Sequence, residues 1–274
     1  MDVSKAVSAI HDFLLEAGDL ALSNQKGIKA MYKDGNQALT EADLAVSKLA
    51  QTRFADWLRA DGHVLIDEES IERSPNDIFA NSEYQWVLDP IDGTAGYALG
   101  RKMWGISLGV LHHGVPLIGG IYMPAVGYFL LSDGSDTYSI DVQSGAREKI
   151  TCKKMDIHSQ IFVESFLGTS FQWGSDINQR KVWLNTPESA VQGGVTAFLN
   201  QAAGSTLMNF YSIWDVAGIA VLAKTSGFKI MSMDDGHEWT KFTADDFKEN
   251  WKLKSNWLLS HPDNFVELSL AIKG

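Results

Sequence analysis

The segment Asp89-Pro90-Ile91-Asp92-Gly93-Thr94 constrains the fold of this chain more than any other stretch of its sequence. It follows directly on the apolar run Trp86-Val87-Leu88, which is typical of a buried strand. Asp89 is therefore expected at the C-terminal edge of that strand, where open α/β sheets hold their ligands. Pro90 lacks an N–H group, so it is expected to stop the strand ladder. The segment predicts a sheet protein with a ligand site at a strand end.

The residue types in this segment suit a hard metal ion next to a phosphate. Asp89 and Asp92 offer carboxylate oxygens of the kind that Mg²⁺ prefers, and the Ile91 carbonyl can add a neutral oxygen. Gly93 lets the backbone approach an anion without a Cβ in the way, and the Thr94 hydroxyl can bind a water or cap a helix. A plain surface turn stays open as the alternative, because Asp, Pro and Gly are ordinary turn residues.

Two further acidic motifs favour the metal site over the plain surface turn. The apolar run His63-Val64-Leu65-Ile66 ends in Asp67-Glu68-Glu69-Ser70, which again puts carboxylates at the mouth of a strand. Trp214-Asp215-Val216-Ala217-Gly218 places an acid where a helix through about Thr225 begins. Helix capping alone would explain Asp215. Three acidic strand ends or helix starts in one chain favour a shared metal site.

With these motifs the chain resembles the inositol monophosphatase family, within the wider group of Mg²⁺-dependent, lithium-sensitive phosphatases. The order and spacing of the motifs agree, and weaker matches at Leu39–Asp43 and Trp104–Gly109 extend the likeness over most of the chain. The resemblance implies an α/β (α+β) fold, a layered αβαβα sandwich of the fructose-bisphosphatase and inositol-monophosphatase type. It also implies a homodimer and inhibition by lithium.

The resemblance assigns roles to individual residues. Thr94 and Asp43 match the pair that orients the attacking water, Glu68 adds to the catalytic group, and Glu69 ranks below Glu68. Backbone N–H groups of Gly93 and Thr94 would hold phosphate oxygens if they open a helix. The family's metal ligands match Glu68, Asp89, the Ile91 carbonyl, Asp92 and Asp215.

The expected reaction is Mg²⁺-dependent hydrolysis of a small phosphate monoester by a metal-activated water, with release of inorganic phosphate. Hydrolysis of such esters needs on the order of 20 kcal/mol of barrier reduction, which two or three Mg²⁺ ions can help to supply. Alternatives on the same scaffold are histidinol-phosphatase, 3'-nucleotidase or fructose-bisphosphatase activity. An alternative of another class is a mainly regulatory, protein-binding role.

Departures from the family pattern concern the substrate. Family members that favour inositol phosphates place an acid about seven residues before the late metal-binding aspartate, where this chain has Met208. The segment 189–214 holds no Asp or Glu at all. The small-residue segment that lines the same pocket has two possible registers, Ser189-Ala190 and Thr196-Ala197. We take Met208, Thr196 and Ala197 as candidate substrate-facing residues.

Composition narrows the possible partners. A formal charge of −11 over 274 residues argues against nucleic acid and would repel a phosphorylated metabolite unless bound cations intervene. Cys152 is the only cysteine, and no apolar stretch approaches the ~20 residues that span a bilayer, so we expect a cytoplasmic protein without a membrane contact. The histidines show no zinc-type spacing, and His112-His113-Gly114 is typical of a hairpin turn.

A polar stretch near Asp141 to Lys154 is the expected boundary between two halves, residues 1–145 and 146–274. The first half would carry most metal ligands and the second the last metal aspartate and the substrate-facing segments. Helical spacing runs from Val3 to Ala21, and Thr40 is a natural N-cap for a second helix with Val46 to Trp57 on one face. Strands are expected at 104–111, 115–123, 128–132, 161–164, 207–211, 229–233 and 257–260, with helices before Gly204 and after Asp215.

Overall fold

The structure is a computed structural model, and it describes residues 1–26, 31–32, 38–155, 161–162, 184–185 and 187–272. Residues 163–164 of the predicted second-half strand at 161–164 lie outside these residues, and Ile161–Phe162 form β10. Two short strands, β1 (Met31–Tyr32) and β2 (Ala38–Leu39), pair with each other, and β2 contacts the short helix α5 (Thr94–Ala98).

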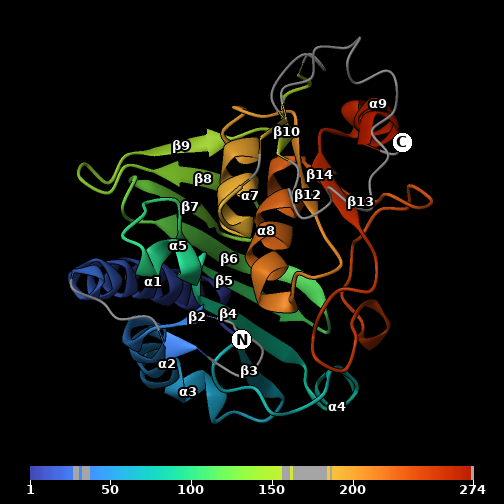
Figure 1. Cartoon of the computed structure of the whole chain (residues 1–274). Coiled ribbons are helices and arrows are strands. Elements are labelled where there is room, and N and C mark those ends of the chain that lie inside the picture. The colour runs from blue at the N-terminus through green and yellow to red at the C-terminus, as the bar shows by residue number, and fades with distance from the viewer. Residues whose placement is uncertain (27–30, 33–37, 156–160, 163–183, 186, 273–274) are drawn as a thin grey trace.

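A seven-stranded sheet forms the centre of the first half, in chain order from β3 to β9 (Figure 1). Only β3 and β4 run parallel, and every other neighbouring pair is antiparallel. The parallel pair matters most, because it brings the C-terminal ends of two strands to one edge. The strands are β3 (His63–Asp67), β4 (Tyr84–Asp92), β5 (Gly105–His112), β6 (Val115–Met123), β7 (Tyr128–Ser132), β8 (Thr137–Ile140) and β9 (Arg147–Ile150).

Helices α1 (Val3–Gln25) and α2 (Glu41–Arg53) cover one face of this sheet (Figure 1). The predicted apolar stripe of α1 is buried from Ala6 to Ala21, whereas Val3 at its start is 36% exposed. The second predicted helix ends at Arg53, and a short α3 (Ala55–Leu58) follows it. Two more short helices, α4 (Pro75–Asn81) and α5 (Thr94–Ala98), flank β4 in sequence.

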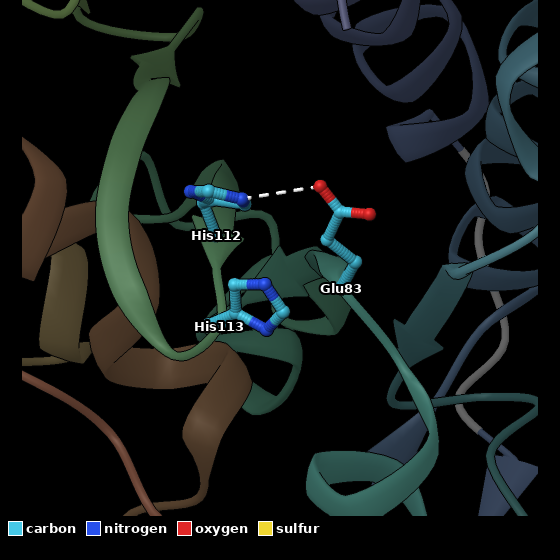
Figure 2. Close-up of side chains that lie close together, drawn as sticks. All are labelled: Glu83, His112 and His113. Atoms are coloured by element: carbon cyan, nitrogen blue, oxygen red, sulfur yellow. Dashed lines mark hydrogen bonds and ion pairs between the residues drawn. The ribbon is translucent and has the colours of Figure 1, made fainter.

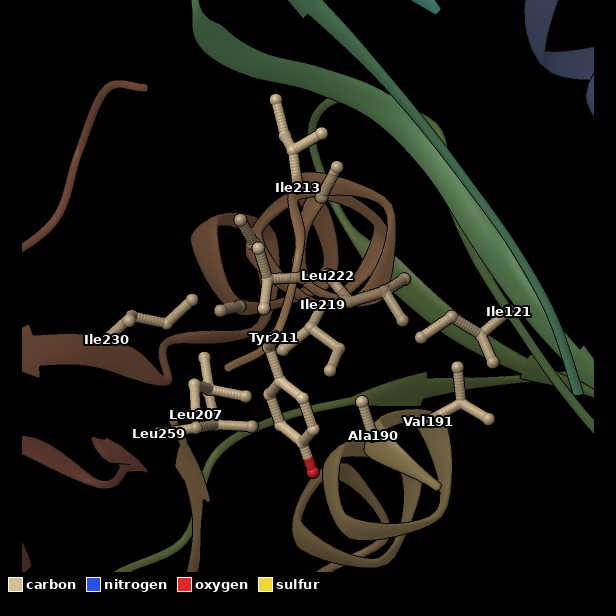
Figure 3. Close-up of a cluster of buried hydrophobic side chains, with 14 of the residues drawn as sticks. Ile121, Ala190, Val191, Leu207, Tyr211, Ile213, Ile219, Leu222, Ile230 and Leu259 are labelled. Carbon is tan, nitrogen blue, oxygen red and sulfur yellow. The ribbon is translucent and has the colours of Figure 1, made fainter. Parts of the chain in front are cut away.

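The other face of the sheet packs against α7 (Ala190–Phe198) and α8 (Ile213–Ser226), which lie between the two sheets (Figure 1). Figure 3 shows Ile213, Ile219 and Leu222 of α8 between Ile121 of the first sheet and Leu259 of the second. Burial of such side chains stabilises each by about 1.5–3 kcal/mol. This core therefore fixes α8, and with it Asp215, against the first sheet.

The second sheet has the order β11-β10-β12-β14-β13 and is backed by α9 (Pro262–Ile272). Its layers complete the αβαβα sandwich, so the predicted fold is confirmed (Figure 1). Its other strands are β11 (Leu184–Asn185), β12 (Gly204–Leu207), β13 (Lys229–Ser232) and β14 (Trp257–Ser260), and a 3₁₀ turn, η2, covers Ala244–Asp246.

One predicted strand was wrong in position. The strand expected at 207–211 lies at 204–207, because Gly204 and Ser205 pair with β14 and the chain then turns. The turn is closed by a hydrogen bond from the Tyr211 N–H to the Met208 carbonyl. The division into halves at residue 145 stays a prediction, and β9 continues the first sheet to Ile150. No helix in the described part of the chain has the length and hydrophobicity that a bilayer crossing requires.

Candidate active site

The end of β4 presents the central acidic motif. Contrary to expectation, Pro90 does not end the ladder: pairing with β5 is interrupted after Asp89 and resumes at Asp92, opposite Gly105. The interruption is a bulge-like register shift, a device that re-aims side chains near functional sites. Asp89 is 1% exposed and Asp92 is 6% exposed. The motif therefore lies at the base of a cavity rather than in a surface turn.

Glu68 reaches the same place from β3. Its N–H donates to the Leu88 carbonyl, so the residue after β3 stays beside β4. Its neighbour Asp67 is fully buried and faces elsewhere, where it accepts hydrogen bonds from Ser47 and Ser70. Asp67 is thus held by hydroxyl groups, while Glu68 lines the cavity.

Asp215 comes from the first turn of α8. One of its oxygens accepts the Ser212 N–H at 2.5 Å, so the residue does cap the helix as the sequence suggested. A carboxylate has further acceptor positions, and Asp215 also lines the cavity with Asp89 and Asp92. Capping and metal binding are compatible here.

The three aspartates Asp89, Asp92 and Asp215 offer oxygens that all lie within 4.8 Å of one another. In the described part of the chain, the buried Oδ1 of Asp89 has no hydrogen-bond partner. Burial and the neighbouring carboxylates raise the pKa of Asp89 well above its usual range, and burial followed by Asp92 and Glu68 does the same for Asp215. An orphaned carboxylate oxygen inside an all-oxygen donor set fits a hard divalent cation.

Thr94 and Asp43 lie side by side beneath this cluster. The Thr94 hydroxyl lies 2.8 Å from the Ile91 carbonyl and 3.3 Å from a carboxylate oxygen of Asp43, and it can donate to either. The other Asp43 oxygen accepts from the N–H and the hydroxyl of Thr40. Burial raises the pKa of Asp43. The predicted pair is thus assembled, with Asp43 held by the cap of α2.

The N-terminus of α7 meets the motif from the second half. The Val191 N–H donates to Asp92 at 2.5 Å, and a Cβ on Gly93 would lie 2.9 Å from the Cβ of Ser189. Gly93 has a φ of +90°, which favours glycine at this position. Of the two registers left open, Ser189-Ala190 therefore lies at the site.

The three candidate substrate-facing residues lie elsewhere. Met208 is 1% exposed and packs with Ala203, Leu258 and Phe265, so its side chain does not line the cavity. Ala197 is fully buried in the core, and the Thr196 hydroxyl donates to the Gln192 carbonyl within α7. These assignments fail because the chain turns after Met208 and because α7 presents its first turn, not its last, to the acids.

The cavity has a volume of about 270 Å³ and walls that the sequence did not single out. Phe210 and Trp214 contribute aromatic side chains, and Lys252 contributes a cation. Lys252 donates to the Phe210 carbonyl at 2.9 Å. A second cavity of about 320 Å³ shares Glu68, Trp214 and Lys252 with the first. No sequence motif indicates Lys252, because it lies in the long connection before β14, far in sequence from each of the acidic motifs.

The raised pKa values predict how pH acts on the metal-free protein. A carboxyl group whose pKa is higher in the folded state favours folding when protonated, and that contribution is lost as pH rises through the raised pKa. Asp43, Asp89 and Asp215 all act in this direction. We expect the stabilisation by Mg²⁺ to grow as pH rises from the ordinary aspartate pKa of about 3.9 towards neutral pH. Thermal unfolding with EDTA or Mg²⁺ across this range measures it, and an unchanged difference would contradict it.

Comparison with known proteins finds a protein family and individual relatives that the chain resembles. A family model described as "Inositol monophosphatase family" matches residues 4–258. The chain is 36% identical over 122 residues to the probable inositol 1-monophosphatase ImpA of Mycobacterium tuberculosis, which is 44% of this chain and 42% of ImpA. It is 26% identical to the quinic acid degradation cluster protein x of Neurospora crassa, over 86% of this chain and 79% of that protein. The chain thus spans less than half of the mycobacterial relative that it matches.

Solved structures support the fold. The extragenic suppressor protein SuhB of Bartonella henselae superposes with a TM-score of 0.77 at 16% identity, over 98% of each chain. The IMPase TM1415 of Thermotoga maritima gives a TM-score of 0.73 at 17% identity, over 99% of this chain and 97% of that chain.

Proposed function

The chain belongs to the inositol monophosphatase family, a family of phosphoric monoester hydrolases, and on that basis we propose that it hydrolyses a small phosphate monoester in a Mg²⁺-dependent reaction. The observation that carries the proposal is the buried Asp89 carboxylate, which has one unpartnered oxygen among the described residues and offers an oxygen within 4.8 Å of oxygens of Asp92 and Asp215. Glu68, Asp89, the Ile91 carbonyl, Asp92 and Asp215 would hold two or three Mg²⁺ ions. Bound Mg²⁺ supplies positive charge for the phosphoryl oxygens and for the leaving oxygen.

The protein's own groups would place the water and the phosphate. Thr94 and Asp43 are within hydrogen-bond distance of each other, so together they can orient a water and accept its proton. Gly93 and Thr94 line the cavity, and their N–H groups are the proposed phosphate donors. Asp92 is oriented by the Val191 N–H and Asp215 by the Ser212 N–H, so neither carboxylate must reorganise to bind a cation.

The side chains that line the cavity indicate which kind of leaving group the site can accept. The cavity walls include Phe210, Trp214 and Lys252, and the described walls hold no counterpart of the polyol-binding acid, because Met208 at that sequence position is buried away from the cavity. Aromatic faces and a cation suit an alcohol part with an apolar face or a second anionic group. Named relatives include a histidinol-phosphatase of Mycobacterium tuberculosis and a 3'(2'),5'-bisphosphate nucleotidase CysQ of Buchnera aphidicola. Those activities stay alternatives to an inositol phosphate substrate.

Phosphate release from a panel of esters tests the proposal. The panel is inositol 1-phosphate, histidinol phosphate, adenosine 3',5'-bisphosphate, fructose 1,6-bisphosphate and glycerol 2-phosphate, each with Mg²⁺ and with EDTA. Turnover of at least one ester that needs Mg²⁺ is expected. Background release from every ester would favour the regulatory alternative. One similarity is in line with that alternative, because a relative from Neisseria meningitidis is named putative Nus factor SuhB. Inhibition by millimolar Li⁺, a homodimer and a cytoplasmic location stay predictions.

Replacement of Lys252 by methionine separates these substrates. The change keeps the aliphatic stem and removes the charge, so we expect kcat/KM for the two bisphosphates to fall about tenfold, a change of about 1.4 kcal/mol. Glycerol 2-phosphate, which has no second phosphate, should lose about threefold or less. Steady-state kinetics on the same panel measures the ratio. Equal losses for mono- and bisphosphates would mean that Lys252 acts on the reacting phosphate alone.

A further inference from the structure

A second cluster of metal-binding side chains lies at the opposite end of β4 from the acids. Glu83 directly precedes β4, while His112 ends β5 and His113 begins the turn to β6. One ligand atom from each residue can be chosen so that all three lie within 4.8 Å of one another. The site is about 20 Å from Asp89, because a strand rises about 3.3 Å per residue. We propose that Glu83, His112 and His113 bind one zinc-class divalent cation.

The distance between His112 and Glu83 fits such an ion. The His112 Nε2 lies 3.2 Å from the Glu83 Oε1. In a tetrahedral zinc site with bonds of about 2.0 Å, neighbouring ligand atoms are about 3.3 Å apart. Figure 2 shows the Glu83 carboxylate facing the His112 ring, with the His113 ring on the same hairpin. Two imidazoles and one carboxylate are donors that favour zinc over Mg²⁺, so this site and the all-oxygen site select different ions.

The backbone holds the three residues in place without a metal. The His113 N–H donates to the Glu83 carbonyl at 2.6 Å, and the Glu83 N–H donates to the Gly62 carbonyl. His113 and Gly114 both have positive φ, as a two-residue hairpin turn requires, so the predicted turn is confirmed and serves as part of the site. The His112 ring stacks on Tyr84, with centroids 4.7 Å apart. A prearranged site of this kind lowers the entropy cost of binding.

The side chains are accessible to solvent. The side chains of His112 and Glu83 are 43% and 46% exposed. Three protein ligands leave a fourth tetrahedral position for water or for a ligand from another molecule. Spacing rules miss this site, because Glu83 lies 29 residues before His112 and directly precedes a different strand.

Zinc titration of the whole protein in excess Mg²⁺, followed by NMR of the histidine side chains, tests the site. We expect one equivalent of Zn²⁺ to shift the His112 and His113 signals before those of His237. His237 is the matched control, since its Nδ1 forms an exposed pair with Asp235 at 2.6 Å. Glu83→Gln and His113→Asn should each weaken Zn²⁺ binding at least about tenfold, and His237→Asn about twofold or less. Asparagine suits the positive φ of residue 113.

Two results would overturn the proposal. One is equal Zn²⁺ affinity in the wild type, Glu83→Gln and His113→Asn proteins. The other is a shift of the His237 signals at the same Zn²⁺ level as those of His112 and His113, which would mean adventitious binding at exposed histidines. If a variant unfolds, as a thermal melt would show, the wild-type signals alone decide between these outcomes.

Discussion

Asp89→Asn is expected to abolish Mg²⁺-dependent phosphate release while raising the stability of the metal-free protein. Activity should fall at least about 1000-fold, because the variant loses a charged ligand at the centre of the cation site, which is worth about 4 kcal/mol or more. Asparagine removes a buried charge that four neighbouring acids oppose, so the variant should melt at least about 3 °C higher in EDTA. Phosphate release and thermal unfolding in EDTA and in Mg²⁺ measure both effects.

Asp67→Asn is the matched control for this result. Asp67 is equally buried and also lies at a strand end, but its oxygens accept hydrogen bonds from Ser47, Ser70 and the Glu69 N–H. Its replacement should cost about 1–3 kcal/mol of stability and leave activity dependent on Mg²⁺. The two variants should therefore change the melting temperature in opposite directions in EDTA. A loss of stability in both would mean that Asp89 has a structural role like that of Asp67.

The acidic site was predictable because its residues lie in contiguous motifs at element ends. Asp89, Asp92 and Thr94 are adjacent in sequence, and Asp215 opens a helix with a clear apolar pattern. The parallel pairing of β3 with β4 then brings Glu68 to the same edge. Local motifs and the family resemblance indicated these residues, and the parallel pairing seen in the structure explains how Glu68 reaches them.

The walls of the cavity were not predictable in the same way. The predicted pocket residue Met208 is in the core because Gly204 and Ser205, residues of low strand propensity, pair with β14 and shift the strand toward the N-terminus. Lys252 enters the site through tertiary packing of a long connection. Glu83 joins two histidines through strand pairing. Contacts between residues distant in sequence decide each of these positions, and a single sequence carries no direct signal for them.

Gly109→Ala is expected to lower the stability of the protein and to weaken Mg²⁺ binding with it. A Cβ at Gly109 of β5 would lie 2.7 Å from the Ala217 carbonyl carbon and 2.8 Å from its oxygen. The contact is with the backbone of α8, so no side-chain rotation relieves it, and overpacking of this kind costs about 1–3 kcal/mol. Because Asp215 lies half a turn before Ala217, a displaced α8 also moves Asp215 away from Asp89 and Asp92. Chemical denaturation and Mg²⁺ titration measure the two losses.

Gly96→Ala is the control for Gly109→Ala, since it makes the same chemical change without the clash. At Gly96 in α5 the nearest atoms to an added Cβ lie 3.5 and 3.8 Å away, and alanine in a helix gains up to about 1 kcal/mol over glycine. If α8 positions Asp215 by resting on Gly109, only Gly109→Ala should weaken both stability and Mg²⁺ affinity. A stability loss with unchanged Mg²⁺ affinity would mean that the first turn of α8 is held by its own cap at Ser212, independently of the contact with β5. The two outcomes decide whether the core between the sheets or the helix cap sets the geometry of the acids.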